Sequence, residues 1–153
     1  MERPTIEIYK SRPNKTSGSA HFDDAGIDIY TPDDYEQKII NPGETFTIET
    51  GLHFNVPQHH MLKICNKTGT AKRGIQFAAE VVDAGFTGEL TLCLRNLGKD
   101  PYVINPGEKI VQGVLLPIIQ GPVCREVSSV EEFTDLDKKS SRGAGKFGST
   151  GLS

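Results

Sequence analysis

The segment ELTLCLRN, residues 89–96, alternates apolar and polar side chains along its length. Successive side chains of a β-strand point to opposite faces, so Leu90, Leu92 and Leu94 share one face. Thr91 and Arg95 lie on the other face. The pattern therefore predicts a strand with one apolar face.

Six further segments with the character of short strands lie on both sides of this one. They are residues 5–10, 26–30, 44–56, 61–65, 74–82 and 109–119. The tetrapeptide NPGE occurs twice, at 41–44 and 105–108, and each copy precedes a strand. Proline presets φ at the second position of a type II turn and glycine accepts the positive φ of the third. Both copies are therefore predicted to form this turn.

Evidence for helices is confined to two short segments. Residues 68–74 are long enough for one or two turns, and SVEE at 129–132 has the spacing of a capping box. Many short strands between glycine and proline turns favour an all-β fold, a jelly-roll-like β-barrel or sandwich. We expect it to carry one short helix and a flexible glycine-rich C-terminal arm. The predicted division is a domain at 1–133 and a linker with the arm at 134–153.

Composition excludes several classes of protein. The net charge of −3 gives no basic excess for a nucleic-acid backbone, so no nucleic-acid partner is expected. No apolar stretch approaches the roughly 18 residues of a membrane span, and the N-terminus lacks an apolar signal region. The three cysteines are far apart and form no CxxC pair, which argues against a zinc site or a disulfide framework. These features favour a reducing, cytoplasmic location.

Two segments are candidate binding sites. Lys67, Thr68 and Gly69 follow a predicted strand and supply a cation, a hydroxyl and an approachable backbone N–H in consecutive positions. The same residues also fit a solvated turn before a short basic helix. Gln112 interrupts an apolar strand, where a buried side chain needs polar partners but one at a strand edge needs none. The residues alone leave both pairs of alternatives open.

Two acidic positions are candidates for chemistry. Asp83 ends an apolar strand, so residues 80–90 are interpreted as a hairpin with this carboxylate at its tip beside Phe86. A carboxylate held there is able to orient and deprotonate a water molecule, although the sequence also fits an ordinary exposed turn. Asp28 points away from its apolar neighbours in AGIDIY, residues 25–30, where a solvated loop is the simpler interpretation.

The segment SRGAGKFGSTGLS, residues 141–153, carries four glycines between positions 142 and 151. It does not match a phosphate-binding P-loop, because Lys146 precedes Phe147 where that loop has Ser or Thr. Such a composition fits a frayed terminus. It also fits a flap over a ligand, with Arg142 on phosphate oxygens and Phe147 stacked on a base.

The order of these segments is more specific than any one of them. AGIDIY, NKTGTA, VVDAGFTGE, PGEKIVQG and RGAGKFGSTG resemble, in that order, the five motifs of the trimeric dUTPase family over nearly the whole chain. Nine of the ten residues of the last motif fit the form Arg-Gly-x-Gly-Gly-Phe-Gly-Ser-Thr-Gly. The resemblance implies hydrolysis of dUTP to dUMP and pyrophosphate, with Mg²⁺ on the triphosphate. Such an activity limits uracil incorporation into DNA and supplies dUMP for thymidylate synthesis.

The resemblance also implies roles for individual residues. Asp83 matches the general base that aligns water for attack on the α-phosphate, and Phe86 stands where the family usually has a tyrosine under deoxyribose. Asp28 would support the water shell of the metal or the neighbouring motif, without binding the metal directly. The backbone of residues 81–83 would contact the uracil edge. The other substrate-binding positions implied are Lys67, Thr68, Gly69, Val81, Val82, Thr91, Gln112, Arg142, Phe147, Gly148, Ser149 and Thr150.

A homotrimer is implied as well, with active sites between subunits and the arm at 134–153 closing over them as a lid. Lys67 and Thr68 depart from the usual Arg-Ser pair, and lysine cannot form the planar two-pronged contact of arginine with phosphate. Two other functions stay open at this point. A dCTP deaminase shares the fold but needs a glutamate where this chain has Cys93. A regulatory binding protein on the same scaffold would need neither Asp83 nor the arm.

Overall fold

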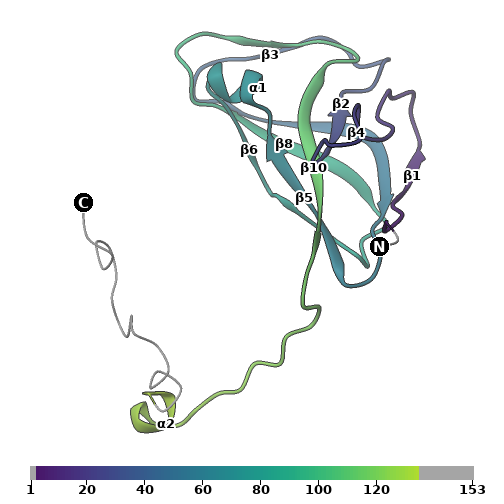
Figure 1. The fold of residues 1–153 in the computed structure, drawn as a ribbon. Coiled ribbons are helices and arrows are strands. Elements are labelled where there is room, and N and C mark those ends of the chain that lie inside the picture. Colours follow the sequence, from purple (N-terminus) through teal and green to yellow (C-terminus); the bar gives the residue numbers. More distant parts are fainter. Residues whose placement is uncertain (1–2, 135–153) are drawn as a thin grey trace. The chain divides into compact units, whose positions relative to one another are not determined.

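The computed structural model describes residues 3–134, and strands make up most of its ordered elements (Figure 1). The described strands are β1 (Glu7–Lys10), β2 (Ile27–Tyr30), β3 (Lys38–Ile40), β4 (Thr45–Asn55), β5 (His60–Asn66), β6 (Ile75–Ala78), β7 (Val81–Asp83), β8 (Glu89–Asn96), β9 (Tyr102–Ile104) and β10 (Lys109–Pro117). The helices are α1 (Thr68–Lys72) and α2 (Val130–Thr134). Both helices fall in segments that the sequence marked, although one short helix was expected and the structure has two.

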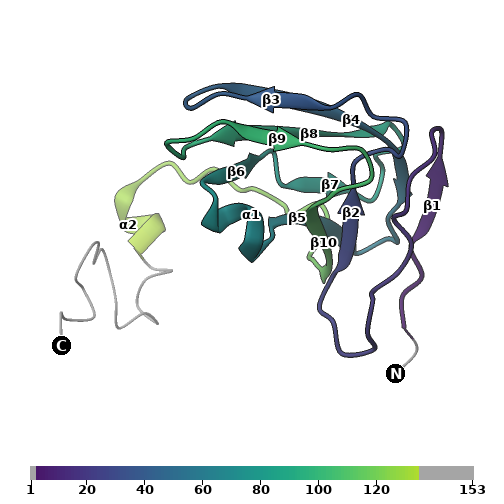
Figure 2. The same cartoon turned by 90° about the horizontal axis from the view of Figure 1, so that it is seen from above.

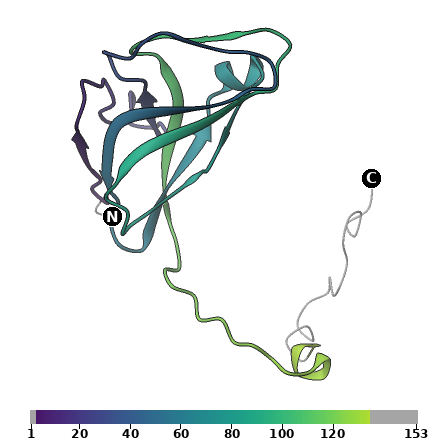
Figure 3. The same cartoon turned by 180° about the vertical axis from the view of Figure 1, so that it is seen from behind.

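The strands form three antiparallel sheets. One has the order β1-β4-β8-β6, the second has the order β2-β10-β5-β7, and β3 pairs with β9 in the third. Figure 2 separates the two large sheets, with β4 and β8 along one side and β5 and β10 along the other. From behind, the long strands β4 and β8 run side by side (Figure 3). This arrangement confirms the predicted all-β fold.

The apolar core lies between the sheets and draws on all three. Its fully buried side chains are Ile29, Ile40, Ile48, Leu52, Leu62, Ile64, Leu92, Leu94, Ile104, Ile110, Val56 and Val111. On β8 the predicted alternation is confirmed, because Leu90, Leu92 and Leu94 are buried while Thr91 and Arg95 are exposed. Isoleucine, leucine and valine thus fill the core of a chain that has no tryptophan.

The two NPGE segments form the turns that the sequence predicts. Gly43 and Gly107 have φ angles of +83° and +62°, which glycine adopts without the strain of a Cβ atom. In both copies the glutamate carboxylate accepts the backbone N–H of the asparagine, at 2.7 Å for Glu44 and 2.9 Å for Glu108. Strands β4 and β10 begin directly after these turns. Both copies of the repeat therefore have the same structural role, a turn that leads into a strand.

Two interpretations of the strand pattern are wrong. Residues 74–82 are not one strand: β6 belongs to the first sheet and β7 to the second, and Ala79 makes the change of direction with a φ of +76°. Residues 80–90 are not a hairpin, because β7 pairs with β5 whereas β8 pairs with β4 and β6. The chain instead turns a corner between sheets. Apolar alternation continues through such a corner, so the pattern could not show which strands pair.

The chain divides into two compact units, one up to Gln120 and one from Gly121 onward. In the second unit, Ser129 Oγ accepts the backbone N–H of Glu132 at 3.1 Å, as the predicted capping box requires. The predicted division at 133/134 falls at the end of the described residues and stays a prediction. Within residues 3–134, neither helix is long and apolar enough to cross a membrane.

Candidate active site

A polar pocket of about 310 Å³ opens where β2, β10 and the start of α1 meet. Asp28 comes from β2 and Gln112 from β10, and the two residues lie directly opposite each other in the antiparallel pair. Lys67 immediately precedes α1, and Lys109 is the first residue of β10. The rest of the lining comes from the loop before β2: Ala20, His21, Asp24, Ala25 and Gly26. The fold thus brings together three of the residues that the sequence singled out, Asp28, Lys67 and Gln112.

Asp28 lies between two ammonium groups. Lys67 Nζ donates to Asp28 Oδ1, and Lys109 Nζ lies 2.9 Å from Asp28 Oδ2. Burial acts to raise the pKa of the Asp28 carboxyl, but the hydrogen bonds and charges of the two lysines together outweigh it and hold the pKa below the ordinary value of an aspartate. The carboxylate therefore stays charged at neutral pH and keeps both cations at the pocket.

The low pKa of Asp28 is open to direct measurement. In an NMR titration, the Asp28 carboxyl is expected to have its midpoint below the ordinary value of an aspartate, and the midpoint should rise in Lys109→Met, which removes one ammonium group. Because the folded-state pKa is depressed, the stabilising effect of this carboxylate is present at neutral pH and is lost as the pH falls through that low value. A midpoint above the ordinary aspartate value in the native protein would show that burial, and not the lysines, dominates.

The position of Gln112 in the sheet decides between a buried side chain with polar partners and one at a strand edge. Strand β10 lies between β2 and β5, so the side chain is not at a sheet edge. It faces the pocket and donates through Nε2 to the carbonyl oxygen of Asn66 at 3.3 Å. The residue is therefore partnered and still borders a space for a ligand.

Thr68 and Gly69 are the first two residues of α1 and are exposed. Apart from the neighbours of Gly69 and the backbone of α1 itself, no atom of the described residues lies within 4 Å of the place where a Cβ would stand, so the backbone there is open to approach. Behind them, Thr70 Oγ1 lies 2.9 Å from the carbonyl oxygen of Lys67 and 3.3 Å from that of Ile110. Thr70 thereby ties the start of α1 to β10.

Asp83 is the exposed last residue of β7, which is one of the two edge strands of the second sheet. The side chain of Val82 is buried in the core, so only its backbone is available to a ligand, whereas Val81 is exposed. Phe86 is 45% exposed and its backbone N–H donates to the carbonyl oxygen of Asp83 at 3.1 Å. Thr91 lies on the exposed face of β8 in the other sheet.

The structure does not bring Asp83 to the polar pocket of the same chain. Asp83 lies opposite Met61 on one side of β5, and Gln112 lies opposite Cys65 on the other side. Four residues along a strand span roughly 13 Å, and two strand spacings add roughly 10 Å across the sheet. A water molecule held by Asp83 is therefore too far from the pocket to attack a phosphate bound there.

The remaining candidates lie in the arm. Arg142, Phe147, Gly148, Ser149 and Thr150 are outside the described residues. Sequence reasoning missed the cation of Lys109, which lies in the segment PGEKIVQG and lines the pocket. Its partnership with Asp28 depends on the pairing of β2 with β10, for which the local sequence carries no signal.

The fold is shared with solved structures of phage enzymes. A point mutant of the Staphylococcus bacteriophage 80alpha dUTPase with dUpNHpp matches with a TM-score of 0.81 at 22% identity, over 98% of this chain and 100% of that one. A point mutant of the dUTPase from phage phi11 of S. aureus matches with a TM-score of 0.71 at 21% identity, over 84% of this chain and 99% of the other. The architecture thus places the chain in a class of all-β proteins that includes these enzymes.

Sequence comparison is more specific. A deoxyuridine 5'-triphosphate nucleotidohydrolase of Clostridium tetani is 36% identical over 135 residues, 86% of each chain. One of Neisseria meningitidis serogroup A is 37% identical over 132 residues, 84% of this chain and 82% of that protein. The family described as dUTPase matches residues 13–151. The chain belongs to the dUTPase family, and its activity is the hydrolysis of dUTP.

Proposed function

We propose that this chain releases pyrophosphate from dUTP at a site assembled from more than one copy of the chain. The observation that carries the proposal is the separation of Asp83 from the polar pocket. The strand of Asp83 and the strand of the pocket residue Gln112 pair with opposite edges of β5. If one copy supplies the pocket and a neighbour supplies Asp83, the two parts face each other across an interface. A closed ring of three copies, as the family resemblance implies, repeats the same interface three times.

Asp83 orients a water molecule and accepts its proton. The water oxygen attacks the α-phosphorus, the bond from that phosphorus to the bridging oxygen of the β-phosphate breaks, and pyrophosphate leaves with the electron pair. A positioned base contributes roughly 10²- to 10⁴-fold to such a step. Lys67 and Lys109 offset the negative charge on the departing pyrophosphate. Thr68, Gly69 and Gln112 hold phosphate oxygens through a hydroxyl, a backbone N–H and an amide.

Mg²⁺ fits this site through the phosphates of the substrate. Both oxygens of Asp28 are engaged by lysines, so this carboxylate suits a position in the water shell of the metal better than direct coordination. No cluster of three or more His, Cys, Asp or Glu side chains that could hold a metal ion occurs within residues 3–134. Mg²⁺ commonly keeps several waters and binds through phosphates, and when bound it neutralises part of their charge.

The second part of the site contacts the nucleoside. The outer edge of β7 leaves backbone groups of residues 81–83 open to the uracil edge, with Thr91 as a further contact. The ring of Phe86 packs under deoxyribose and leaves no room for a 2′-hydroxyl. The arm closes over the bound nucleotide, with Arg142, Ser149, Thr150 and the backbone of Gly148 on the phosphates and Phe147 on the base. We place the enzyme in the cytoplasm, where its three free cysteines, Cys65, Cys93 and Cys124, stay reduced.

Substrate selectivity tests this assignment. Pyrophosphate release with Mg²⁺ is expected to be faster from dUTP than from UTP, dCTP or dTTP. The contact with the sugar disfavours UTP, and the contacts with the base disfavour dCTP and dTTP. The variant Phe86→Leu should lose selectivity against UTP while keeping turnover of dUTP. Phe133→Leu, at an exposed ring of α2, is the matched control. Equal turnover of UTP and dUTP by the native enzyme would remove Phe86 from its role. Ammonia release from dCTP would indicate a deaminase instead.

A further inference from the structure

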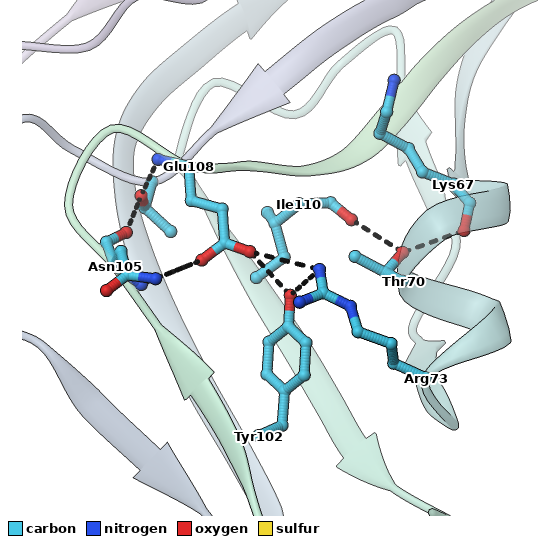
Figure 4. A network of polar contacts seen from close by, with 8 residues as sticks. Lys67, Thr70, Arg73, Tyr102, Asn105, Glu108 and Ile110 are labelled. Atoms are coloured by element: carbon cyan, nitrogen blue, oxygen red, sulfur yellow. Dashed lines mark hydrogen bonds and ion pairs between the residues drawn. The ribbon is translucent and has the colours of Figure 1, made fainter.

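Three side chains join the end of α1 to the turn that precedes β10 (Figure 4). Tyr102 Oη donates to Glu108 Oε1 at 2.7 Å and accepts from Arg73 Nη2 at 3.0 Å. The guanidinium also lies over the Tyr102 ring, with Cζ 4.6 Å from the ring centroid, and its Nη2 is 3.6 Å from Glu108 Oε1. One buried tyrosine therefore connects a cation on the helix to a carboxylate on the turn.

Glu108 connects this cluster to a third element, the end of β2. Its backbone N–H donates to Thr31 Oγ1 at 2.8 Å, and its carbonyl oxygen accepts the Thr31 N–H at 2.9 Å. The Thr31 hydroxyl in turn donates to the carbonyl oxygen of Asn105 at 2.7 Å. The carboxylate itself is mostly buried, with 17% of the side chain exposed. We call Arg73, Tyr102, Glu108 and Thr31 the anchor cluster.

Each element held by the anchor cluster carries a residue of the polar pocket. The helix that Arg73 follows starts directly after Lys67, and Glu108 directly precedes Lys109. Thr31 directly follows β2, the strand of Asp28. No member of the anchor cluster lines the pocket. The cluster is therefore placed to fix the relative positions of groups that it does not touch.

We propose that the anchor cluster positions the phosphate-binding groups of this enzyme, with Tyr102 as its central positioning residue. The inference rests on the proposed function, because it assumes that the pocket receives the triphosphate. Lys67 and Lys109 can be shared between Asp28 and phosphate oxygens only if α1, β2 and β10 keep a fixed spacing. Burial raises the pKa of Tyr102, and the hydrogen bond to Glu108 raises it further, so the hydroxyl remains a donor across the working pH range.

The variant Tyr102→Phe tests this role, because it keeps the buried ring and removes only the bridging hydroxyl. We expect Kd for dUpNHpp with Mg²⁺ to rise about five- to tenfold, on the order of the net contribution of one ordinary hydrogen bond. Kd for deoxyuridine, which has no phosphates, should stay unchanged. Tyr35→Phe, at a partly buried tyrosine packed against the core, is the matched control and should alter neither affinity.

The outcomes separate the two proposals. If the native enzyme fails to hydrolyse dUTP, the proposed function fails. If it hydrolyses dUTP but Tyr102→Phe binds dUpNHpp as tightly as the native enzyme does, the positioning role is overturned, even when the melting temperature falls. An equal loss of affinity for deoxyuridine and dUpNHpp would also overturn it, because it would show a general disturbance. If Tyr102→Phe proves unstable, Arg73→Lys is the second variant. It keeps the positive charge but loses the planar stack on the Tyr102 ring, so it should weaken binding of dUpNHpp and leave binding of deoxyuridine unchanged.

Discussion

Replacing Asp83 with asparagine is expected to lower turnover of dUTP by at least about 100-fold, the lower end for losing a positioned base. The amide has nearly the shape of the carboxylate but cannot accept a proton from water at neutral pH. The side chain is exposed at the end of an outer strand, so the change leaves no buried group without a partner. Steady-state pyrophosphate release gives the loss, and Kd for dUpNHpp should remain close to that of the native enzyme.

Glu80→Gln is the matched control, because it removes the charge of another exposed carboxylate in the same segment. Among residues 3–134, the Glu80 carboxylate has one ion pair, a long one with Lys63 at 3.8 Å, and exposed pairs of this kind contribute little. Turnover in this variant should therefore stay near the native value. Near-native turnover in Asp83→Asn would exclude Asp83 as the base and would mean that another group accepts the proton from water.

Mixing two inactive variants is expected to restore activity if the site is shared between copies. One variant is Asp83→Asn, and the other is the double variant Lys67→Ala with Gln112→Ala, which removes two groups of the pocket. After joint refolding in equal amounts, about one site in four should combine a native pocket from one copy with a native Asp83 from another. Pyrophosphate release should then recover to about a quarter of the native rate.

The alternative outcome is unambiguous. If each copy completes its own site, no mixed assembly contains a native site and no activity returns. Light scattering on the same samples supplies the control, because both variants and the mixture should have the mass of a trimer. A monomer mass in a preparation that hydrolyses dUTP would refute both the trimer and the shared site.

The sequence predicts well where local chemistry determines the outcome. The alternation in β8 and the two NPGE turns are such cases, since each follows from side-chain period or from the φ preferences of proline and glycine. Strands β3 and β9 were missed because three residues are too few to show a period. The interpretation failed between β6 and β7 because the positive φ at Ala79 is a property of the folded chain that an alanine does not signal.

The site, like the fold, has parts that could be predicted from the sequence and parts that could not. Motif resemblance singled out Asp28, Lys67 and Gln112, and the pairing of strands brings them together. The anchor cluster could not be predicted, because its contacts join residues far apart in the chain: Thr31 and Glu108 are 77 positions apart. Such contacts depend on the order of strands in the sheets, which a pattern along one chain does not contain. The distance between Asp83 and the pocket is hidden for the same reason.

The packing of the Phe86 ring against Gly88 has a consequence for how this enzyme can evolve. A Cβ at position 88 would stand 2.7 Å from Phe86 Cζ, which is the free end of a half-exposed side chain. A methyl group there would therefore push the ring aside and leave the strands intact. If the Phe86 ring excludes a 2′-hydroxyl, as proposed above, selection at position 88 acts through the nucleotides that the enzyme accepts, and only weakly through stability. A lineage that replaced Phe86 by a small side chain would be free to vary position 88, so the two positions are expected to change together.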